Sequence, residues 1–188
     1  NNISKRIIQF NNIVFTGFNT FYYNRILGLI FYRPYCCNLI SKGDVNLMEL
    51  KQIYTELIRE HSNNKFNKRP LEDATASELG HNPSCGDEIT LNVKIEDGKV
   101  ADASYEGVGC AISQASASMM IDAIKGKTVE EARDLAATFI GMIKGEITDE
   151  DELEKLEDAI VLQNISVLPA RVKCAVLAWH TLDNILKK

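Results

Sequence analysis

The sequence predicts an α+β fold in which a small antiparallel β-sheet packs against several helices. Two segments with alternating apolar residues, 89–95 and 101–105, are separated by a glycine turn, and the later segments have helical character. Because the strands come first and the helices follow, we expect helices on one face of the sheet. The chain has 188 residues, 45% of them hydrophobic, which suits a domain with its own core.

The first part of this fold is predicted as a helix, a loop and a hairpin. A helix should begin at Met48, because apolar side chains recur there at the spacing of one helical face (Leu50, Ile53, Tyr54, Leu57 and Ile58). A polar loop is expected over 62–82. The alternation over 89–95 predicts a half-buried strand, and Asp97-Gly98 predicts a tight turn into the second strand.

Four helices are expected after the hairpin. The first, over 111–125, is small and apolar. Thr128 and Glu131 have the spacing of a capping box, which predicts the start of the second. An acidic helix is expected over 149–162. Pro169 suits the first position of the last helix, because proline there costs no hydrogen bond.

Residues 1–47 differ from the rest of the chain. They carry a net charge of +4 and are rich in Asn, Ile, Phe and Tyr. Their apolar residues show neither strand nor helix periodicity. Serine is too scarce and arginine too infrequent for a typical transit peptide. We therefore expect residues 1–47 to be either a disordered extension or the product of a mis-assigned start, and 48–188 to be the folded domain. The composition resembles translated AT-rich non-coding DNA, which favours Met48 as the true start. Cys36 and Cys37 are therefore excluded from the candidate site.

Composition also argues against several classes of function. The total charge is −5, so residues 48–188 carry −9, which disfavours nucleic acid and suits a protein partner with a basic surface. No secretory signal or long uncharged apolar run is visible, so we expect a cytoplasmic protein without a membrane span. Five cysteines form no paired framework, as in an intracellular protein that uses thiols for chemistry.

Three cysteines and one aspartate form the candidate site. Cys85 and Asp87 lie in N-P-S-C-G-D, Cys110 in G-V-G-C-A, and Cys174 in R-V-K-C-A. Three soft thiolates and one carboxylate suffice for a closed four-coordinate metal site. Gly86 would let Cys85 and Asp87 converge, since glycine permits a sharp turn.

The surroundings of these cysteines favour the thiolate form. Cys110 opens a helix and Cys174 lies in the early turns of another, where the helix dipole stabilises an anion. Arg171 and Lys173 add positive charge beside Cys174. The alternatives are three buried core cysteines, and a turn or cap role for Asp87.

The three histidines are weaker candidates. His81 precedes Cys85 by four residues, but a surface position in the loop is the favoured interpretation. His180 is expected to be a packed or partly exposed helix residue. His61 should end the first helix, where a cation is favoured by the dipole.

Three motifs taken together, N-P-S-C-G-D, G-V-G-C-A-I-S-Q-A-S-A-S and R-V-K-C-A, resemble the U-type iron–sulfur cluster assembly proteins, the family of IscU and the NifU N-terminal domain. The resemblance covers Leu47 to Lys188. Within the family it is nearest to the SufU branch, because Lys173 stands where the IscU branch has histidine. The acidic segment at 149–162 is similar to an extra segment of SufU.

This resemblance implies a small antiparallel sheet packed with helices and a zinc ion held by Cys85, Asp87, Cys110 and Cys174. It also implies that Cys85 accepts persulfide sulfur from SufS, a pyridoxal-phosphate cysteine desulfurase, for downstream Suf scaffold components. In that scheme a desulfurase histidine replaces one cysteine on zinc, and Arg171 and Lys173 support the freed anion.

The favoured interpretation is therefore a zinc-dependent sulfurtransferase, an enzyme-like function. The first alternative is a scaffold on which a [2Fe–2S] cluster is assembled and released, with iron in place of zinc. The second is a small protein in which the zinc is only structural.

Overall fold

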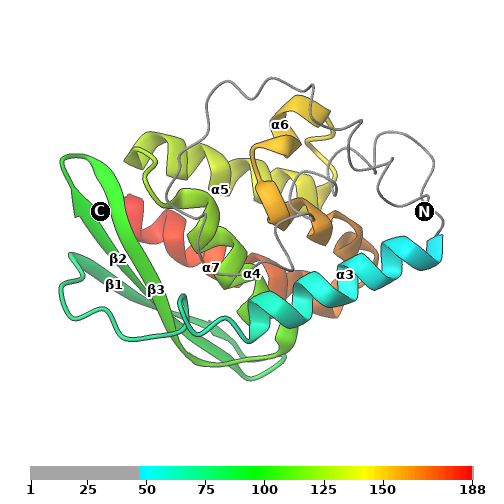
Figure 1. The fold of residues 1–188 in the computed structure, drawn as a ribbon, viewed down its shortest axis with the longest axis horizontal. Coiled ribbons are helices and arrows are strands. Elements are labelled where there is room, and N and C mark those ends of the chain that lie inside the picture. The colour runs from blue at the N-terminus through cyan, green and yellow to red at the C-terminus, as the bar shows by residue number, and fades with distance from the viewer. Residues whose placement is uncertain (1–46, 188) are drawn as a thin grey trace, which may run out of the picture. The chain divides into compact units, whose positions relative to one another are not determined.

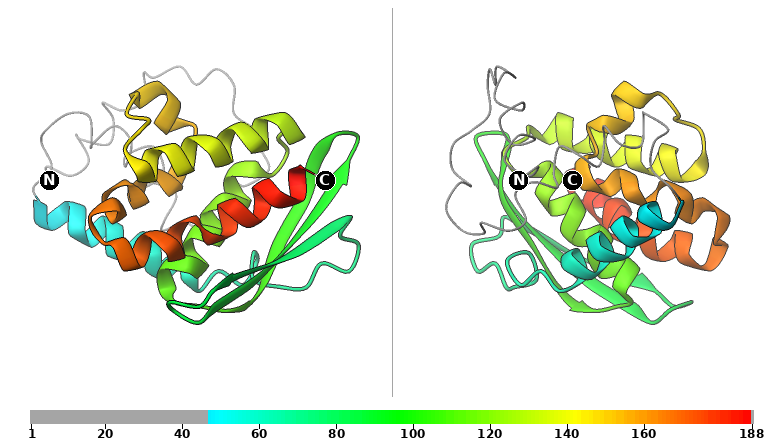
Figure 2. Two further views of the ribbon diagram at one scale, coloured as in Figure 1. Left: turned by 180° about the vertical axis from the view of Figure 1, so that it is seen from behind. Right: turned by 45° about the vertical axis from the view of Figure 1, so that its right-hand side comes forward.

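The computed structural model describes residues 47–187, with side chains from Tyr54 onward and at Gln52. The segment 1–46, which contains Cys36 and Cys37, lies outside the described residues, so the structure does not test the start-site hypothesis. The side chains of Leu50 and Ile53 are also outside the described part. Among the described elements, a three-stranded antiparallel sheet is covered on one face by helices, as predicted (Figures 1 and 2). No helix within 47–187 combines the length and the apolar character needed to cross a membrane.

The strands follow one another in the sheet in chain order. They are β1 (Ala76–Asn82), β2 (Asp87–Glu96) and β3 (Lys99–Val108), with β2 in the centre. The predicted hairpin is confirmed, because Asp97 and Gly98 both have positive φ between β2 and β3. On the inner face, Leu91 lies opposite Tyr105, and both are fully buried under the helices.

Strand β1 corrects the loop predicted over 62–82. Its sequence, A-S-E-L-G-H-N, has no clear apolar alternation, so nothing local marks it as a strand. Pairing with β2 and packing of α7 (Pro169–Leu186) against it decide its conformation. The approach is close, since a Cβ at Gly80 would lie 2.4 Å from the Thr181 Oγ1 atom.

The helices form a layer over the sheet. Helices α4 (Ala111–Ile124) and α7 contact the strands, while α3 (Leu47–Ser62) and α5 (Val129–Lys144) pack against α4 and α7 respectively. The predicted capping box of α5 is present. In the core, the Phe139 and Trp179 rings stack with centroids 4.2 Å apart, and the Trp179 indole N–H donates to the Ser116 hydroxyl.

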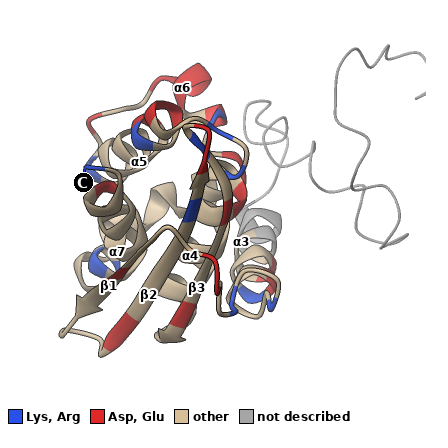
Figure 3. Cartoon of the chain, turned by 90° about the vertical axis from the view of Figure 1, so that its left-hand side faces the viewer, with Lys and Arg blue, Asp and Glu red and all other residues tan. Residues whose placement is uncertain are grey.

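The acidic helix predicted over 149–162 is not continuous. It divides into α6 (Glu150–Glu154) and a 3₁₀ segment, η2 (Glu157–Val167). Glu157, with a φ of 51°, interrupts the helix, because a left-handed residue cannot continue a right-handed one. Acidic residues occupy the first turn of α6, which is coloured red in Figure 3, and Leu153 is the buried residue of this helix.

His61 is a buried residue as well as a helix end. Its side chain lies 3.1 Å from the Ser118 hydroxyl through Nδ1 and 3.3 Å from the Asp158 carboxylate through Nε2. The imidazole thus joins α3 to α4 and η2. We predicted only that the dipole at the end of α3 acts on His61, whereas the side chain is also held by Ser118 and Asp158.

We predict that Gly107→Ala destabilises the fold beside the candidate site. Gly107 has a φ of +112°, and an added Cβ would lie 2.0 Å from the Glu88 carbonyl oxygen. We expect the free energy of unfolding to fall by about 3 kcal/mol in urea denaturation. Gly98→Ala is the control, because Gly98 also has positive φ but open space around it, and should lose only about 1 kcal/mol. Equal losses would show that the clash at Gly107 is relieved.

Candidate metal centre

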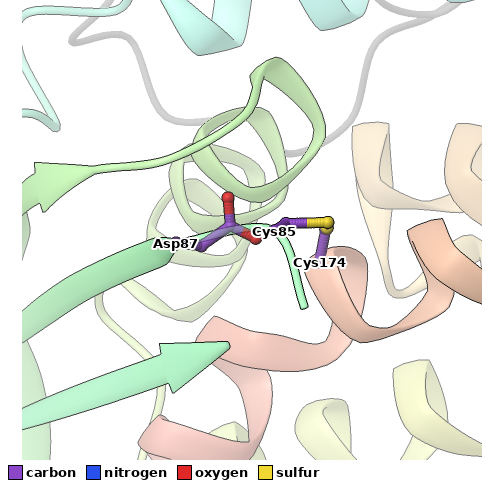
Figure 4. A group of neighbouring side chains, drawn as sticks. All are labelled: Cys85, Asp87 and Cys174. Atoms are coloured by element: carbon purple, nitrogen blue, oxygen red, sulfur yellow. The ribbon is translucent and has the colours of Figure 1, made fainter. Parts of the chain in front are cut away.

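The structure brings three of the four predicted residues together. Cys85 lies between β1 and β2, Asp87 is the first residue of β2, and Cys174 lies in the second turn of α7 (Figure 4). One donor atom from each lies within 4.8 Å of the others. The Cys85 and Cys174 Sγ atoms are 3.2 Å apart. Residues distant in sequence therefore present two sulfurs and a carboxylate to one point.

The turn between β1 and β2 sets the position of Cys85. The backbone N–H groups of Cys85 and Gly86 both donate to the Asn82 carbonyl oxygen, at 3.2 and 2.9 Å. Gly86 has a φ of +69°, a conformation that glycine adopts without steric cost. The turn leaves the Cys85 side chain exposed, whereas Cys174 is buried.

Asp87 is fully buried and held by donors. The backbone N–H of Cys110 donates to Oδ1 at 2.8 Å, and the Asn82 amide donates to Oδ2 at 3.0 Å. Burial acts to raise the pKa of the Asp87 carboxyl, but these hydrogen bonds and those from Cys174 and Ser113 outweigh it, so the pKa lies below its ordinary value. Asp87 is therefore a buried carboxylate that is held in one orientation at the start of β2.

Cys110 lies at the border of this group. Its side chain caps the N-terminus of α4 by accepting from the Ser113 backbone N–H at 3.5 Å, as its predicted place at a helix start requires. It is half-buried, and its sulfur is not among the three donors that share one point. Its backbone nevertheless binds Asp87, so Cys110 contacts the group directly.

Cys174 is a more protonated thiol than we predicted from its neighbours. Burial raises its pKa above the ordinary value, and hydrogen bonds with Cys85 and Asp87 act in the same direction. These effects exceed the predicted influence of the helix start and of Arg171 and Lys173. A coordinated divalent cation reverses this balance, because it deprotonates a coordinating thiol.

The two basic residues of α7 have different surroundings. The Cys110, Cys85 and Cys174 sulfurs, in their thiolate form, raise the pKa of the exposed Arg171 guanidinium, and a hydrogen bond with Cys174 acts in the same direction. Lys173 instead donates to the Ser84 hydroxyl at 3.3 Å. Arg171 is thus the cation next to the sulfurs, and Lys173 lies against the loop that carries Cys85.

Asn82 was missed in the sequence, although it opens the N-P-S-C-G-D motif. Its buried side-chain amide donates both to Asp87 and to the Cys174 Sγ atom, the latter at 3.4 Å. Its backbone carbonyl accepts the hydrogen bonds that form the Cys85 turn. An asparagine before proline signals only a turn. Its second role appears only when α7 is folded against β1.

We predict that Asn82→Ala lowers the free energy of unfolding by about 2 kcal/mol, because Asp87 loses a buried donor. Urea denaturation measures this loss, and the Cys85 alkylation rate should change as its turn loosens. Asn63→Ala is the control, since Asn63 is exposed and bonds only locally to the Arg59 carbonyl. A loss at Asn82 no larger than at Asn63 would contradict the prediction.

His81 and His180 are exposed and lie outside the group of three donors. His81 is on β1 and not in the predicted loop, and His180 is on α7 as predicted. Within the described residues, neither imidazole belongs to the group of side chains that could ligate a metal.

Known proteins share this sequence and fold. Residues 53–174 match the model of the NifU-like N terminal domain. The chain is 49% identical to an iron-sulfur cluster assembly scaffold protein IscU of Thermotoga maritima, over 75% of this chain and 97% of the relative. It is 42% identical to the zinc-dependent sulfurtransferase SufU of Bacillus subtilis, over 74% and 92% of the two chains.

A solved structure agrees with this assignment. The crystal structure of FiSufU, a SUF-system iron-sulfur cluster assembly scaffold protein from Fervidobacterium islandicum AW-1, superposes with a TM-score of 0.66 at 40% identity. The match covers 72% of this chain and 97% of that one. With the motif residues gathered at the end of the sheet, these likenesses show that the chain belongs to the NifU-like N-terminal domain family.

Proposed function

We propose that this protein is a zinc-dependent sulfurtransferase of iron–sulfur cluster assembly. It takes sulfur from a SufS-type, pyridoxal-phosphate cysteine desulfurase and passes it to downstream Suf scaffold components. The observation that carries the proposal is an exposed Cys85 thiol held 3.2 Å from the buried Cys174 thiol, next to the buried Asp87 carboxylate. The likeness to the Bacillus subtilis sulfurtransferase SufU supports it.

The donor set fits zinc. Cysteine sulfur and aspartate oxygen are common zinc ligands, and Cys85, Asp87 and Cys174 offer them within 4.8 Å of one another. Cys110, which contacts Asp87 through its backbone, would be the fourth ligand. When bound, zinc would stabilise the thiolates without oxidising them, because it has no redox chemistry.

Sulfur transfer requires a cysteine that a partner protein can reach, and Cys85 is the exposed thiol of the three. Its thiolate attacks the outer sulfur of the donor persulfide. A new S–S bond forms on Cys85 while the donor S–S bond breaks, and the donor cysteine leaves as a thiolate, so no external oxidant is needed. Arg171, beside the sulfurs, stabilises the anionic forms.

The relatives named IscU favour a second function, a scaffold that assembles and releases a [2Fe–2S] cluster. Three cysteines and an aspartate would ligate such a cluster, with the carboxylate making it labile. This proposal differs from the first in metal content and in the fate of the sulfur.

Elemental analysis of anaerobically purified protein separates the two proposals. We expect about one zinc per chain, no visible absorbance, and faster turnover of a SufS-type desulfurase when the protein is added. Iron with acid-labile sulfide and a brown colour would overturn the sulfurtransferase in favour of the scaffold. Zinc without any stimulation of the desulfurase would indicate a structural metal.

A further inference from the structure

A groove of about 350 Å³ lies beside the loop that carries Cys85. One wall is the end of β1 with the following turn, and the other is α7. The lining residues are His81, Asn82, Pro83, Ser84, Lys173, Val176, Leu177 and His180. Ser84 precedes Cys85 directly, so one end of the groove lies next to the exposed thiol.

The dimensions of the groove suit a short extended peptide. Its four α7 residues lie at positions 173, 176, 177 and 180, the spacing of one helical face. Seven residues of helix rise about 10 Å, which is the length of about three extended residues. The contact from Lys173 Nζ to Ser84 Oγ bridges the two walls near Cys85.

The chemistry of the lining is partly apolar and contains no acid. Val176 and Leu177 are half-buried and Pro83 faces them from the other wall, while His81 and His180 supply imidazole groups. The His180 side chain reaches solvent, but its partial burial, with the charges of Lys144 and Lys187, lowers its pKa against the opposing effect of Asp183. The ring is therefore neutral at pH 7 and can donate one hydrogen bond. Lys173 adds a positive charge.

This lining contrasts with the net charge of −9 over residues 48–188, which follows from the total of −5 and the +4 of residues 1–47. A cation and two hydrogen-bond donors, with no carboxylate among the lining residues, favour an acidic group in the groove, and the nearby Asp183 carboxylate is paired with Lys187. The half-buried aliphatic side chains favour an apolar group next to it.

We propose that this groove receives an extended segment of about three residues from the sulfur donor, adjoining its persulfide cysteine and carrying an apolar side chain and a carboxylate. The inference rests on the proposed function. The apolar side chain packs on Val176 and Leu177, and the carboxylate binds Lys173 and the imidazoles. Docking there brings the donor persulfide to the Cys85 end of the groove.

The test places a carboxylate in the groove. His81→Glu and His180→Glu change exposed side chains, so the fold and the zinc content should be retained. With a purified SufS-type desulfurase, we expect its Kd, measured by calorimetry, and its KM in sulfur transfer to rise about tenfold, because like charges repel, with kcat unchanged. Ala137→Glu, an exposed site on α5, is the matched control for added charge and should leave both values unchanged.

The outcomes separate the groove from the proposed function. Sulfur on Cys85 is detected as a mass increase of one sulfur atom, independently of the Kd. If the wild type gains sulfur but the two groove variants bind the desulfurase as tightly as the control, the groove proposal is wrong. If binding weakens as expected but the wild type gains no sulfur, the groove stands and the sulfurtransferase falls. Slower delivery to a downstream acceptor with an unchanged desulfurase Kd would also overturn the donor assignment.

Discussion

Cys85→Ser should abolish the acceptance of sulfur by this protein. Cys85 is the exposed thiol of the site, and a serine hydroxyl at neutral pH is too weak a nucleophile to attack a persulfide. We expect no added sulfur in the mass spectrum after incubation with desulfurase and cysteine, and at least a hundredfold loss of stimulation. The side chain is exposed and the replacement is similar in size, so the metal-free folds should differ by less than about 0.5 kcal/mol in unfolding free energy.

The control for Cys85→Ser is the double variant Cys36→Ser/Cys37→Ser in the full-length chain. These two cysteines lie in the N-terminal segment excluded from the site, so sulfur acceptance should be unchanged. Persulfide that still forms on Cys85→Ser protein would assign the acceptor to another thiol. Cys110, which is half-buried, would then be tested next.

Asp87→Ala should both weaken zinc binding and destabilise the fold. The carboxylate is fully buried and accepts from the Cys110 backbone and the Asn82 amide, and its removal leaves both donors without this partner. We expect a loss of about 3 kcal/mol in unfolding free energy, and faster zinc release to a chelator. With less metal, air should oxidise Cys85 and Cys174 to a disulfide, since their sulfurs already lie 3.2 Å apart.

Two further variants separate the ligand role of Asp87 from its structural role. Asp87→Asn keeps the shape and an acceptor for the Cys110 N–H but removes the charge, so it should keep more stability than zinc affinity. Asp73→Ala is the control, because the Asp73 side chain is 63% exposed and pairs only with Lys94 at the surface. If Asp87→Ala protein kept full zinc and full activity, Asp87 would not be a ligand.

Several elements could be predicted because their signals are local. Asp97-Gly98 favours the positive φ values of a tight hairpin turn, and the observed turn has them. Thr128 and Glu131 satisfy each other's backbone groups within one helical turn, and Pro169 begins the last helix. In each case the interacting groups are within a few residues, so the sequence itself contains the evidence.

The missed elements depend on contacts between distant segments. Strand β1 contains a glycine and few apolar residues, and it is a strand because β2 pairs with it on one side and α7 packs on it. The acidic helix was predicted because Leu153, Leu156 and Ile160 would lie on one helical face. Leu153 and Leu156 are indeed buried, but the positive φ of Glu157 divides the helix. Local periodicity contains neither effect.

By itself the sequence determined the family, the antiparallel hairpin with its following helices, and the residue types of the candidate site. The motifs reveal these features because a thiol, a carboxylate or a turn-forming glycine belongs to a single residue and can be read directly from the sequence. Only the tertiary structure decided that Cys85 is exposed while Cys174 is buried, that Asn82 joins Asp87 to Cys174, and that a groove without acidic residues adjoins Cys85. The physical reason is that the packing of α7 against β1 sets the burial and the hydrogen bonds of these side chains, and the two elements are about 90 residues apart in the chain.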